Sequence, residues 1–356
     1  MQKDKFFTVE SSKSSVIQKG KGASILPLFL SFVMLWMAFP VKAQANVSLP
    51  ESVTQINISN ISIAPGASTS TIQEAIDHVN SSGGGKVIFQ SGTYILTGSV
   101  TLKSNVSLVG AGRDNTILKL SAGINLGGYG VLNRPDGGLS NVTIKNLTID
   151  ANTFTDPDSN PTALRNYGIL VQGENGTNNR IMLNNIKVTN SEMGVHFKGT
   201  TNLTIQDSII NNNGGLNKYW HNLYLRRVSN VLVKNTELSE SSSGNGINIS
   251  YSDNITIDSC QVYDNAFRGI RASDSSHINV INNDVYGNVT GDGIVYIGEI
   301  TGVTSFQIKG NTVRNNGGYG IFVSSDSSNG EVKSNIDGGG NTKGFSLISG
   351  SNIIIQ

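Results

Sequence analysis

Short runs of alternating apolar and polar residues fill most of the chain, and from about residue 129 they repeat. Each repeat contains two phrases, and equivalent positions recur about 22 to 28 residues apart. The first phrase is a glycine or asparagine followed by an aliphatic residue, as in Gly168-Ile169, Gly194-Val195, Asn222-Leu223, Gly246-Ile247, Gly269-Ile270, Gly293-Ile294 and Gly320-Ile321. The second phrase is apolar-polar-apolar, as in Val142-Thr143-Ile144, Ile181-Met182-Leu183, Leu203-Thr204-Ile205, Val231-Leu232-Val233, Ile255-Thr256-Ile257, Ile278-Asn279-Val280 and Phe306-Gln307-Ile308.

This pattern predicts short β-strands separated by Asn-, Gly- and Ser-rich turns. A unit of two or three such strands cannot bury its apolar face alone, whereas stacked copies share one core. We therefore expect an all-β, single-domain, right-handed parallel β-helix. Each strand would pair with its equivalent about 4.8 Å along the axis.

The segment before the repeats has a different period. The pattern Thr71-Ile72-Gln73-Glu74 is a capping box, and Ile72, Ala75, Ile76 and Val79 share one helical face. We expect a helix that caps the open end of the solenoid, followed by strands at 86–90 and 93–96. The β-helix domain is predicted to span 70–356, with 46–69 as a linker or strand segment.

Residues 1–45 have the order of a secretory signal peptide. Five lysines precede an apolar run from Ile25 to Phe39, and Ala43-Gln44-Ala45 follows. The alternative is an uncleaved membrane anchor, although the run is short for a span. We expect the protein to be secreted or periplasmic, without a membrane association once the leader is cleaved.

The composition narrows the possible partners. Charged residues are 14% of the chain, against about 25% in ordinary domains, and the formal net charge is +1 without a Lys/Arg run. This argues against a nucleic-acid partner. Cys260 is the only cysteine, so a secreted chain of this size must be stabilised by its own core, and we expect a monomer.

One polar column follows the second phrase. Stacked turn side chains can hydrogen-bond along such a column, so we assign it a structural role. Its members are Asn146, Asn185, Asp207, Asn235, Ser259 and Asn282.

The stretch from Ser70 to Leu120 contains IQEAIDHVNSSGGGKVIFQSGTYIL and LKSNVSLVGAGRDNTILKL, and NLTIDAN follows at 146–152. It resembles the entrance of pectate-lyase-superfamily β-helices, most closely the catalytic modules of mannuronan C5-epimerases. The resemblance covers roughly 70–320 and implies the scaffold, which lyases, hydrolases, epimerases and non-enzymes share. Where those epimerases carry Y-G-F-D-P-H, this chain reads Met193-Gly194-Val195-His196-Phe197-Lys198, so the family's catalytic set is not carried over.

Side-chain alternation predicts which strand residues face outward. The first and third residues after each glycine should face the core, and the second and fourth should face solvent. The outward positions of consecutive coils bring together polar and titratable groups with no carboxylate among them, a surface that favours an anionic ligand. They are His196, Lys198, Tyr224, Arg226 and Arg271, with Asn248 in the same row.

Two insertions, 150–166 and 211–221, enter this same strand, and long loops on a rigid scaffold often carry function. We predict substrate contacts from Arg165, Tyr219 and Trp220, although packing of the second loop onto the solenoid explains its aromatics equally well. Arg268 precedes a glycine phrase and is a further candidate; Asp292 would pair with it or sit in a turn. Asp156-Pro157-Asp158-Ser159-Asn160 offers oxygen ligands for Ca²⁺, but a solvated acidic loop is the default, and no metal ligand is assigned.

These residues suit chemistry on a uronic-acid polysaccharide. Removing the C5 proton builds negative charge beside the sugar carboxylate, which Arg or Lys can stabilise. His196 or Lys198 would be the base, Tyr224 the acid, and Arg226 and Arg271 the carboxylate clamps. The reaction would be β-elimination or C5-epimerisation. The alternatives are a non-catalytic carbohydrate-binding or adhesin-like protein and, third, a polygalacturonase-type hydrolase, which needs two carboxylates.

Overall fold

The computed structural model describes residues 59–134, 136–153, 165–174 and 176–356. The predicted leader at 1–45 and the acidic loop at 156–160 lie outside these ranges. No helix in the described ranges has the length and apolar character needed to cross a bilayer.

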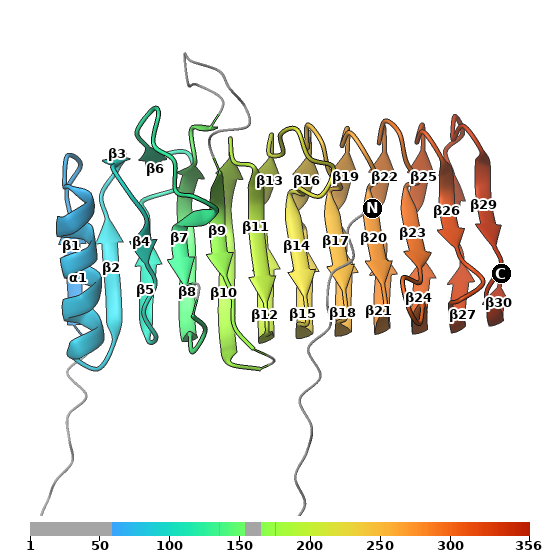
Figure 1. Ribbon diagram of the computed structural model, residues 1–356, viewed down its shortest axis with the longest axis horizontal. Coiled ribbons are helices and arrows are strands. Elements are labelled where there is room, and N and C mark those ends of the chain that lie inside the picture. Colours follow the sequence, from blue (N-terminus) through green and yellow to red (C-terminus); the bar gives the residue numbers. More distant parts are fainter. Residues whose placement is uncertain (1–58, 135, 154–164, 175) are drawn as a thin grey trace, which may run out of the picture. The chain divides into compact units, whose positions relative to one another are not determined.

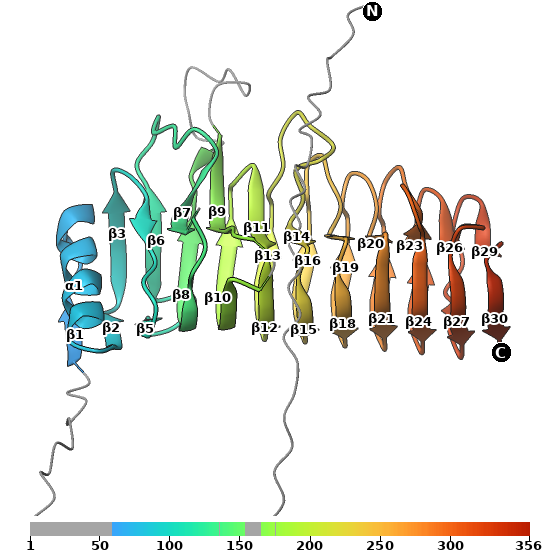
Figure 2. The same cartoon turned by 60° about the horizontal axis from the view of Figure 1, so that its bottom comes forward.

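The described chain winds into a solenoid whose coils form three walls of parallel strands (Figures 1 and 2). This is the predicted parallel β-helix. The first wall consists of β1 (Ser59–Ile63), β2 (Gly85–Phe89), β5 (Val106–Val109), β8 (Ser140–Asp150), β10 (Asn178–Thr189), β12 (Thr200–Gln206), β15 (Ser229–Lys234), β18 (Asp253–Asp258), β21 (Ser275–Ile281), β24 (Val303–Lys309), β27 (Ser328–Lys333) and β30 (Ser351–Ile355).

The second wall continues from the first through the long strands β8 and β10. Its own strands are β3 (Gly92–Leu96), β6 (Thr116–Leu120), β13 (Ile209–Asn211), β16 (Glu237–Ser239), β19 (Gln261–Tyr263), β22 (Asp284–Tyr286), β25 (Thr312–Arg314) and β28 (Ile336–Asp337). The third wall is a separate sheet of β4 (Val100–Thr101), β7 (Tyr129–Arg134), β9 (Asn166–Val171), β11 (Met193–Lys198), β14 (Leu223–Arg226), β17 (Ile247–Ser250), β20 (Ile270–Ser273), β23 (Ile294–Ile297), β26 (Tyr319–Val323) and β29 (Gly344–Ile348).

The third wall carries the glycine-aliphatic phrases, and its inward residues are the predicted ones. Val195 and Phe197 on β11 are fully buried, as are Leu223 and Leu225 on β14. Burial of these side chains fixes the register, because a slip of one residue would move every apolar side chain to the outer face.

Helix α1 (Thr69–Ser81) contacts β1, β2, β4 and β5 at the start of the solenoid. The helix buries the predicted apolar face, as the periodicity indicates; its buried residues are Ile72, Ala75, Ile76 and Val79. The predicted capping box at Thr71 is wrong by one turn: Ser68 is the N-cap, and its Oγ accepts a hydrogen bond from the backbone N–H of Thr71. Because β1 pairs with β2, the first strand of the fold precedes residue 70.

The predicted polar column forms hydrogen bonds between coils. Asn185 donates to Asn146 over 2.9 Å, and Asn235 donates to Asp207 over 2.7 Å. All four residues have φ between 45° and 57°, a region that Asn and Asp tolerate better than other non-glycine residues. Asn282 departs from the expectation, since it donates to Asp258 and not to Ser259.

A second, fully buried asparagine ladder crosses the turns of later coils. Asn288 donates to Asn316 over 2.8 Å and accepts from the side chain of Asn265 over 3.0 Å. The same residue also donates to the carbonyl of Val262.

Asn288→Ala should lower the free energy of unfolding by about 2–4 kcal/mol, because several buried polar groups on the neighbouring coils lose their partners. Urea denaturation measures this change. The matched control is Asn279→Ala on the outer face of β21, where the side chain is half-buried and the change should stay within about 0.5 kcal/mol. Equal effects for both variants would contradict a stabilising role for the buried ladder.

Candidate functional site

Neighbouring strands of the third wall bring the predicted site residues into two adjacent columns. His196, Tyr224, Asn248 and Arg271 are successive partners in the register of β11, β14, β17 and β20. Lys198 pairs with Arg226 in the second column, which continues into serines. The geometric prediction of a single row on one wall is therefore correct.

A cavity of about 460 Å³ opens over this row. Four cationic side chains line it: Arg226, Arg268, Arg271 and Lys218. Six of the predicted residues contribute to it, namely Tyr224, Arg226, Arg271, Tyr219, Asn248 and Arg268. His196, Lys198, Trp220 and Arg165 are not among the described lining residues.

His196 is next to the cavity but is almost fully buried. Its ring stacks on Tyr224 with centroids 4.7 Å apart, and its Nδ1 lies 3.4 Å from Nε2 of Gln172. Burial, together with the charges of Arg226 and Lys198, lowers the pKa of His196 to about 3. The imidazole is therefore neutral at neutral pH, and its Nε2 is buried without a hydrogen-bond partner in the described part of the chain.

His221 is a residue that the sequence reasoning did not select for the site. It precedes β14, lines the cavity and meets the ring of Tyr224 edge-on at 5.6 Å. Its Nδ1 accepts the backbone N–H of Asn245 over 3.0 Å. Burial, then the charge of Arg271, lowers its pKa to about 3, so the neutral ring carries its proton on Nε2. Its position at the end of the insertion 211–221 was the sequence signal that could have indicated a place in the site.

Arg271 is 8% exposed and makes three contacts. Its Nη1 donates to Asn248 Oδ1 over 3.2 Å and to Ser273 Oγ over 3.1 Å, while Nη2 forms an ion pair with Glu299. The expectation of a row without a carboxylate partner is therefore wrong. Glu299 lies in the loop after β23, so strand alternation could not reveal it.

The other two arginines lie against aromatic rings. The guanidinium of Arg268 is 4.2 Å from the ring centroid of Phe267, and burial followed by the charge of Arg271 lowers its pKa. Arg226 lies 5.9 Å from the ring centroid of Tyr251. Asp292 Oδ1 accepts the backbone N–H of Tyr319 on the next coil over 2.8 Å, and its charge acts to raise the pKa of Arg268, against the effects of burial and Arg271.

The aromatic pair of the second insertion divides between two roles. Tyr219 is 65% exposed at the rim of the cavity. Trp220 packs on its own loop: a Cβ on Gly215 would lie 2.7 Å from the indole. Loop packing therefore accounts for Trp220, while Tyr219 is free to meet a ligand.

A buried carboxyl group, Glu192, precedes β11 and was also missed. It is 1% exposed, and neither carboxylate oxygen has a hydrogen-bond partner among the residues that the structure describes. Burial raises its pKa to about 7, with the charge of Arg165 acting in the opposite direction. Arg165 is exposed, and its backbone N–H donates to Asn125 Oδ1.

These buried groups predict how stability depends on pH. Each histidine binds its proton more weakly when folded, so between about pH 3 and 6.5 rising pH stabilises the protein by up to about 1.4 kcal/mol per unit for each. Glu192 binds its proton more tightly when folded and opposes this between about pH 4.5 and 7. From pH 4.5 to 6.5 the two histidines raise the free energy of unfolding as the pH rises, while Glu192 lowers it, so the net slope should be about that of one histidine. Glu192→Gln removes the opposing contribution and should about double this slope. Urea titrations across this range measure it; an unchanged slope in the variant would contradict the shifted pKa of Glu192.

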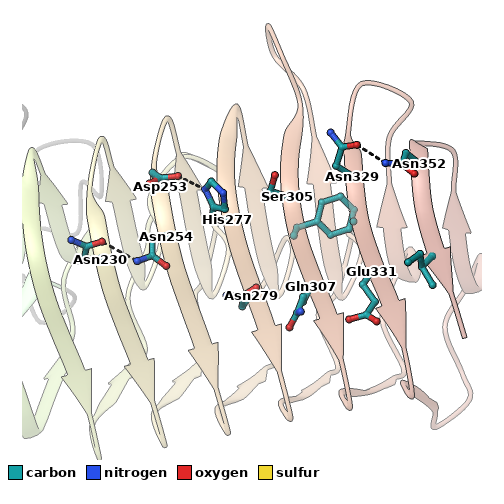
Figure 3. Close-up of a pocket in the computed structure, with 13 residues that line it drawn as sticks. Asn230, Asp253, Asn254, His277, Asn279, Ser305, Gln307, Asn329, Glu331 and Asn352 are labelled. Carbon is teal, nitrogen blue, oxygen red and sulfur yellow. Dashed lines mark hydrogen bonds and ion pairs between the residues drawn. The ribbon is translucent and has the colours of Figure 1, made fainter.

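A second cavity, of about 780 Å³, lies on the outer face of the first wall (Figure 3). Its amides pair with each other, as Asn254 with Asn230 and Asn352 with Asn329. Its titratable lining groups are Glu331, Asp253 and His277, whose Nδ1 lies 2.8 Å from Asp253 Oδ1. Lacking Lys or Arg among its described lining residues, this surface suits an acidic polymer poorly.

The described residues contain no cluster of three or more His, Cys, Asp or Glu able to hold a metal ion. The predicted Ca²⁺ loop at 156–160 falls outside them, so Ca²⁺ binding there stays a prediction.

Comparisons with known proteins agree with this architecture. A family model described as a right-handed beta helix region matches residues 193–356, and one described as rhamnogalacturonase A/epimerase, pectate lyase-like, matches 66–162. Among solved structures, the A-module of mannuronan C-5 epimerase AlgE4 from Azotobacter vinelandii has a TM-score of 0.61 at 21% identity, covering 81% of this chain and 93% of that one. PfbA, a surface adhesin of Streptococcus pneumoniae, has a TM-score of 0.55 at 14% identity over 83% and 93% of the chains.

Two curated relatives come from the same bacterium as the epimerase module. Mannuronan C5-epimerase AlgE2 of Azotobacter vinelandii is 26% identical over an alignment of 239 residues, and the match covers 57% of this chain and 24% of that protein. Alginate lyase 7 of the same organism is 30% identical over an alignment of 156 residues, and the match covers 41% of this chain and 18% of that protein. The chain thus spans about a quarter of the length of AlgE2. Together, the coil geometry, the family model over 193–356 and the structural neighbours show that the chain has the fold of a right-handed parallel β-helix, and its segment 66–162 is similar to the pectate-lyase-like family model.

Proposed function

We propose that this protein acts on an acidic, uronic-acid polysaccharide in the cavity of the third wall, by removal of the C5 proton in a β-elimination or C5-epimerisation. The observation that carries the proposal is the cluster of Arg226, Arg268 and Arg271 beside Tyr224 and His221 in one cavity. The names of the relatives, mannuronan C5-epimerase and alginate lyase, support the same class of substrate.

The charge of the cavity supports an anionic ligand. Four cationic side chains line it against one carboxylate, that of Glu299, among the described lining residues. Arg226 lies on the coil of β14, and Arg268 and Arg271 lie on the coil of β20, so the guanidinium groups form a row that spans two coil repeats of about 4.8 Å each along the axis. Such a row can meet successive carboxylates of an extended acidic chain, and guanidinium groups bind carboxylates with good geometry.

Two groups in the cavity can supply protons. Ser250 Oγ donates to the hydroxyl oxygen of Tyr224 over 3.4 Å, which leaves the phenol's own proton free for substrate. His221 is held with its proton on Nε2 and can donate to negative charge that develops on the sugar. The arginines stabilise the charge that builds beside the carboxylate when the C5 proton leaves.

The base, in this proposal, is His196 or Lys198, one coil before Tyr224. Burial keeps the imidazole of His196 neutral, as a base must be, but it also lowers the pKa to about 3, which makes His196 a weaker base than an exposed imidazole. A sugar chain bound along the row would reach β11 by crossing the ring of Tyr224, on which His196 stacks.

Hydrolysis fits the cavity less well. A glycosidase of the usual kind needs two carboxyl groups across the scissile bond. In the part of the chain that the structure describes, Glu299 is the only carboxylate lining the cavity, and Asp292 is engaged by the backbone of Tyr319.

We also infer secretion, from the order of basic, apolar and Ala-x-Ala segments in residues 1–45. A polysaccharide too large to enter a cell is then accessible to the enzyme. Function as a monomer completes the proposal, with Ca²⁺ at the loop 156–160 as the one cofactor candidate.

A panel of purified uronans, including mannuronan and polygalacturonate, tests the function. A lyase gives a rise in ultraviolet absorbance from the unsaturated product, and an epimerase changes the proton NMR spectrum of the polymer without shortening it. If the protein binds a uronan but gives no change in either assay, the alternative function of a non-catalytic carbohydrate-binding protein is favoured over the enzyme. Absence of binding to every uronan would refute the proposal.

A further inference from the structure

The ion pair between Arg271 and Glu299 joins a buried cation to a solvent-accessible anion. The side chain of Arg271 is 9% exposed, whereas that of Glu299 is 54% exposed. Arg271 is held in the wall by the neutral oxygens of Asn248 and Ser273, so its position does not depend on Glu299.

The loop that carries Glu299 is anchored through its backbone. Asp274 Oδ1 accepts the backbone N–H groups of Glu299, Ile300 and Thr301 at 2.8 to 3.1 Å. Gly302 ends the loop with φ of 78°. Because the backbone is fixed independently, the Glu299 side chain can leave Arg271 by rotamer changes alone.

We infer that Glu299 is a resident carboxylate that occupies the Arg271 subsite and is displaced by the carboxylate of an incoming uronate. The inference rests on the proposed function for the identity of the ligand. The contacts of Arg271 with Asn248 and Ser273 are to neutral groups, so its charge needs one anionic partner. Glu299 is that partner in the free protein, and the carboxylate of the sugar takes its place in the complex. Glu299 thereby sets the affinity of the cavity and disfavours neutral saccharides, which cannot replace it.

Acetate rescue tests the subsite without any sugar. Glu299→Ala leaves Arg271 buried without its anion, so its melting temperature should fall in chloride and recover in acetate at equal ionic strength. The wild type should respond little to the exchange, and Glu299→Ala combined with Arg271→Met should show no recovery. Absence of an acetate-specific recovery in Glu299→Ala would overturn the inference, whatever the protein does with uronans.

Affinity for an oligouronate gives the second readout. Glu299→Gln keeps the shape of the side chain and removes its charge, so it should bind a mannuronate or galacturonate hexasaccharide about 5- to 10-fold more tightly, with a steeper salt dependence. The matched control is Glu240→Gln, an exposed glutamate outside the cavity, which should leave affinity unchanged. Unchanged or weaker binding in Glu299→Gln would show that Glu299 does not compete with the ligand. If the wild type binds no uronan, the proposed function fails while acetate rescue still decides the subsite.

Discussion

Tyr224→Phe should lower turnover of a uronan by about 10²- to 10⁴-fold, the usual contribution of a positioned proton donor. The substitution removes only the hydroxyl that Ser250 contacts and leaves the ring between His196 and His221. The free energy of unfolding should therefore change little. Initial rates and urea denaturation of the same preparation separate the two effects.

Tyr219→Phe is the matched control, because this exposed tyrosine lies on the rim of the same cavity and has no assigned proton transfer. It should retain turnover within a few-fold. Single replacement of His196 by Gln and of Lys198 by Met tests the base, and each should also abolish activity if it is that group. Full activity in the variants of Tyr224, His196 and Lys198 alike would eliminate this set of catalytic residues.

Arg271→Met should weaken binding of an oligouronate by about 30- to 1,000-fold, the range for removing one partner of a buried, hydrogen-bonded charge pair. Arg271 is central in the row and its guanidinium is already oriented by Asn248 and Ser273, so its loss removes a preformed carboxylate site. Methionine keeps much of the apolar stem and limits the packing defect.

Arg227→Met provides the comparison for this variant. Arg227 follows β14, is exposed and does not line the cavity. Its substitution by methionine removes the same net charge as Arg271→Met does. Calorimetric titration at two salt concentrations should show a loss of affinity and of salt dependence for Arg271→Met, and only a small uniform change for Arg227→Met. Equal effects in both would mean that net charge, and not a site, drives binding.

The periodic part of the fold could be predicted from the sequence. In a stacked solenoid, one glycine-aliphatic phrase per coil fixes which residues face the core, and pairing with the next coil then fixes their neighbours. Tyr224 and Asn248 are adjacent for this reason, and so are Asn248 and Arg271. Two-residue alternation and the buried columns leave no freedom for a different register.

The parts that escaped prediction lie where the period stops. Glu299 reaches Arg271 from a loop. The repeat pattern covers the strands only, so it does not predict where a loop side chain meets the wall. His221 enters the cavity just ahead of β14, outside the alternation of the strand. The helix start was misplaced because Ser68 and Thr71 are both capable N-caps one turn apart, and the Ser68 side chain is the one that accepts a backbone N–H, that of Thr71.

A crystal structure of the protein with a bound uronate hexasaccharide tests the central claim most directly. We expect the sugar chain to run along β14, β17 and β20, with carboxylates at hydrogen-bonding distance from Arg226, Arg268 or Arg271 and with Glu299 turned away from Arg271. A hexasaccharide on the first wall, in the cavity of Figure 3, or one whose carboxylates face solvent over the third wall, would contradict it.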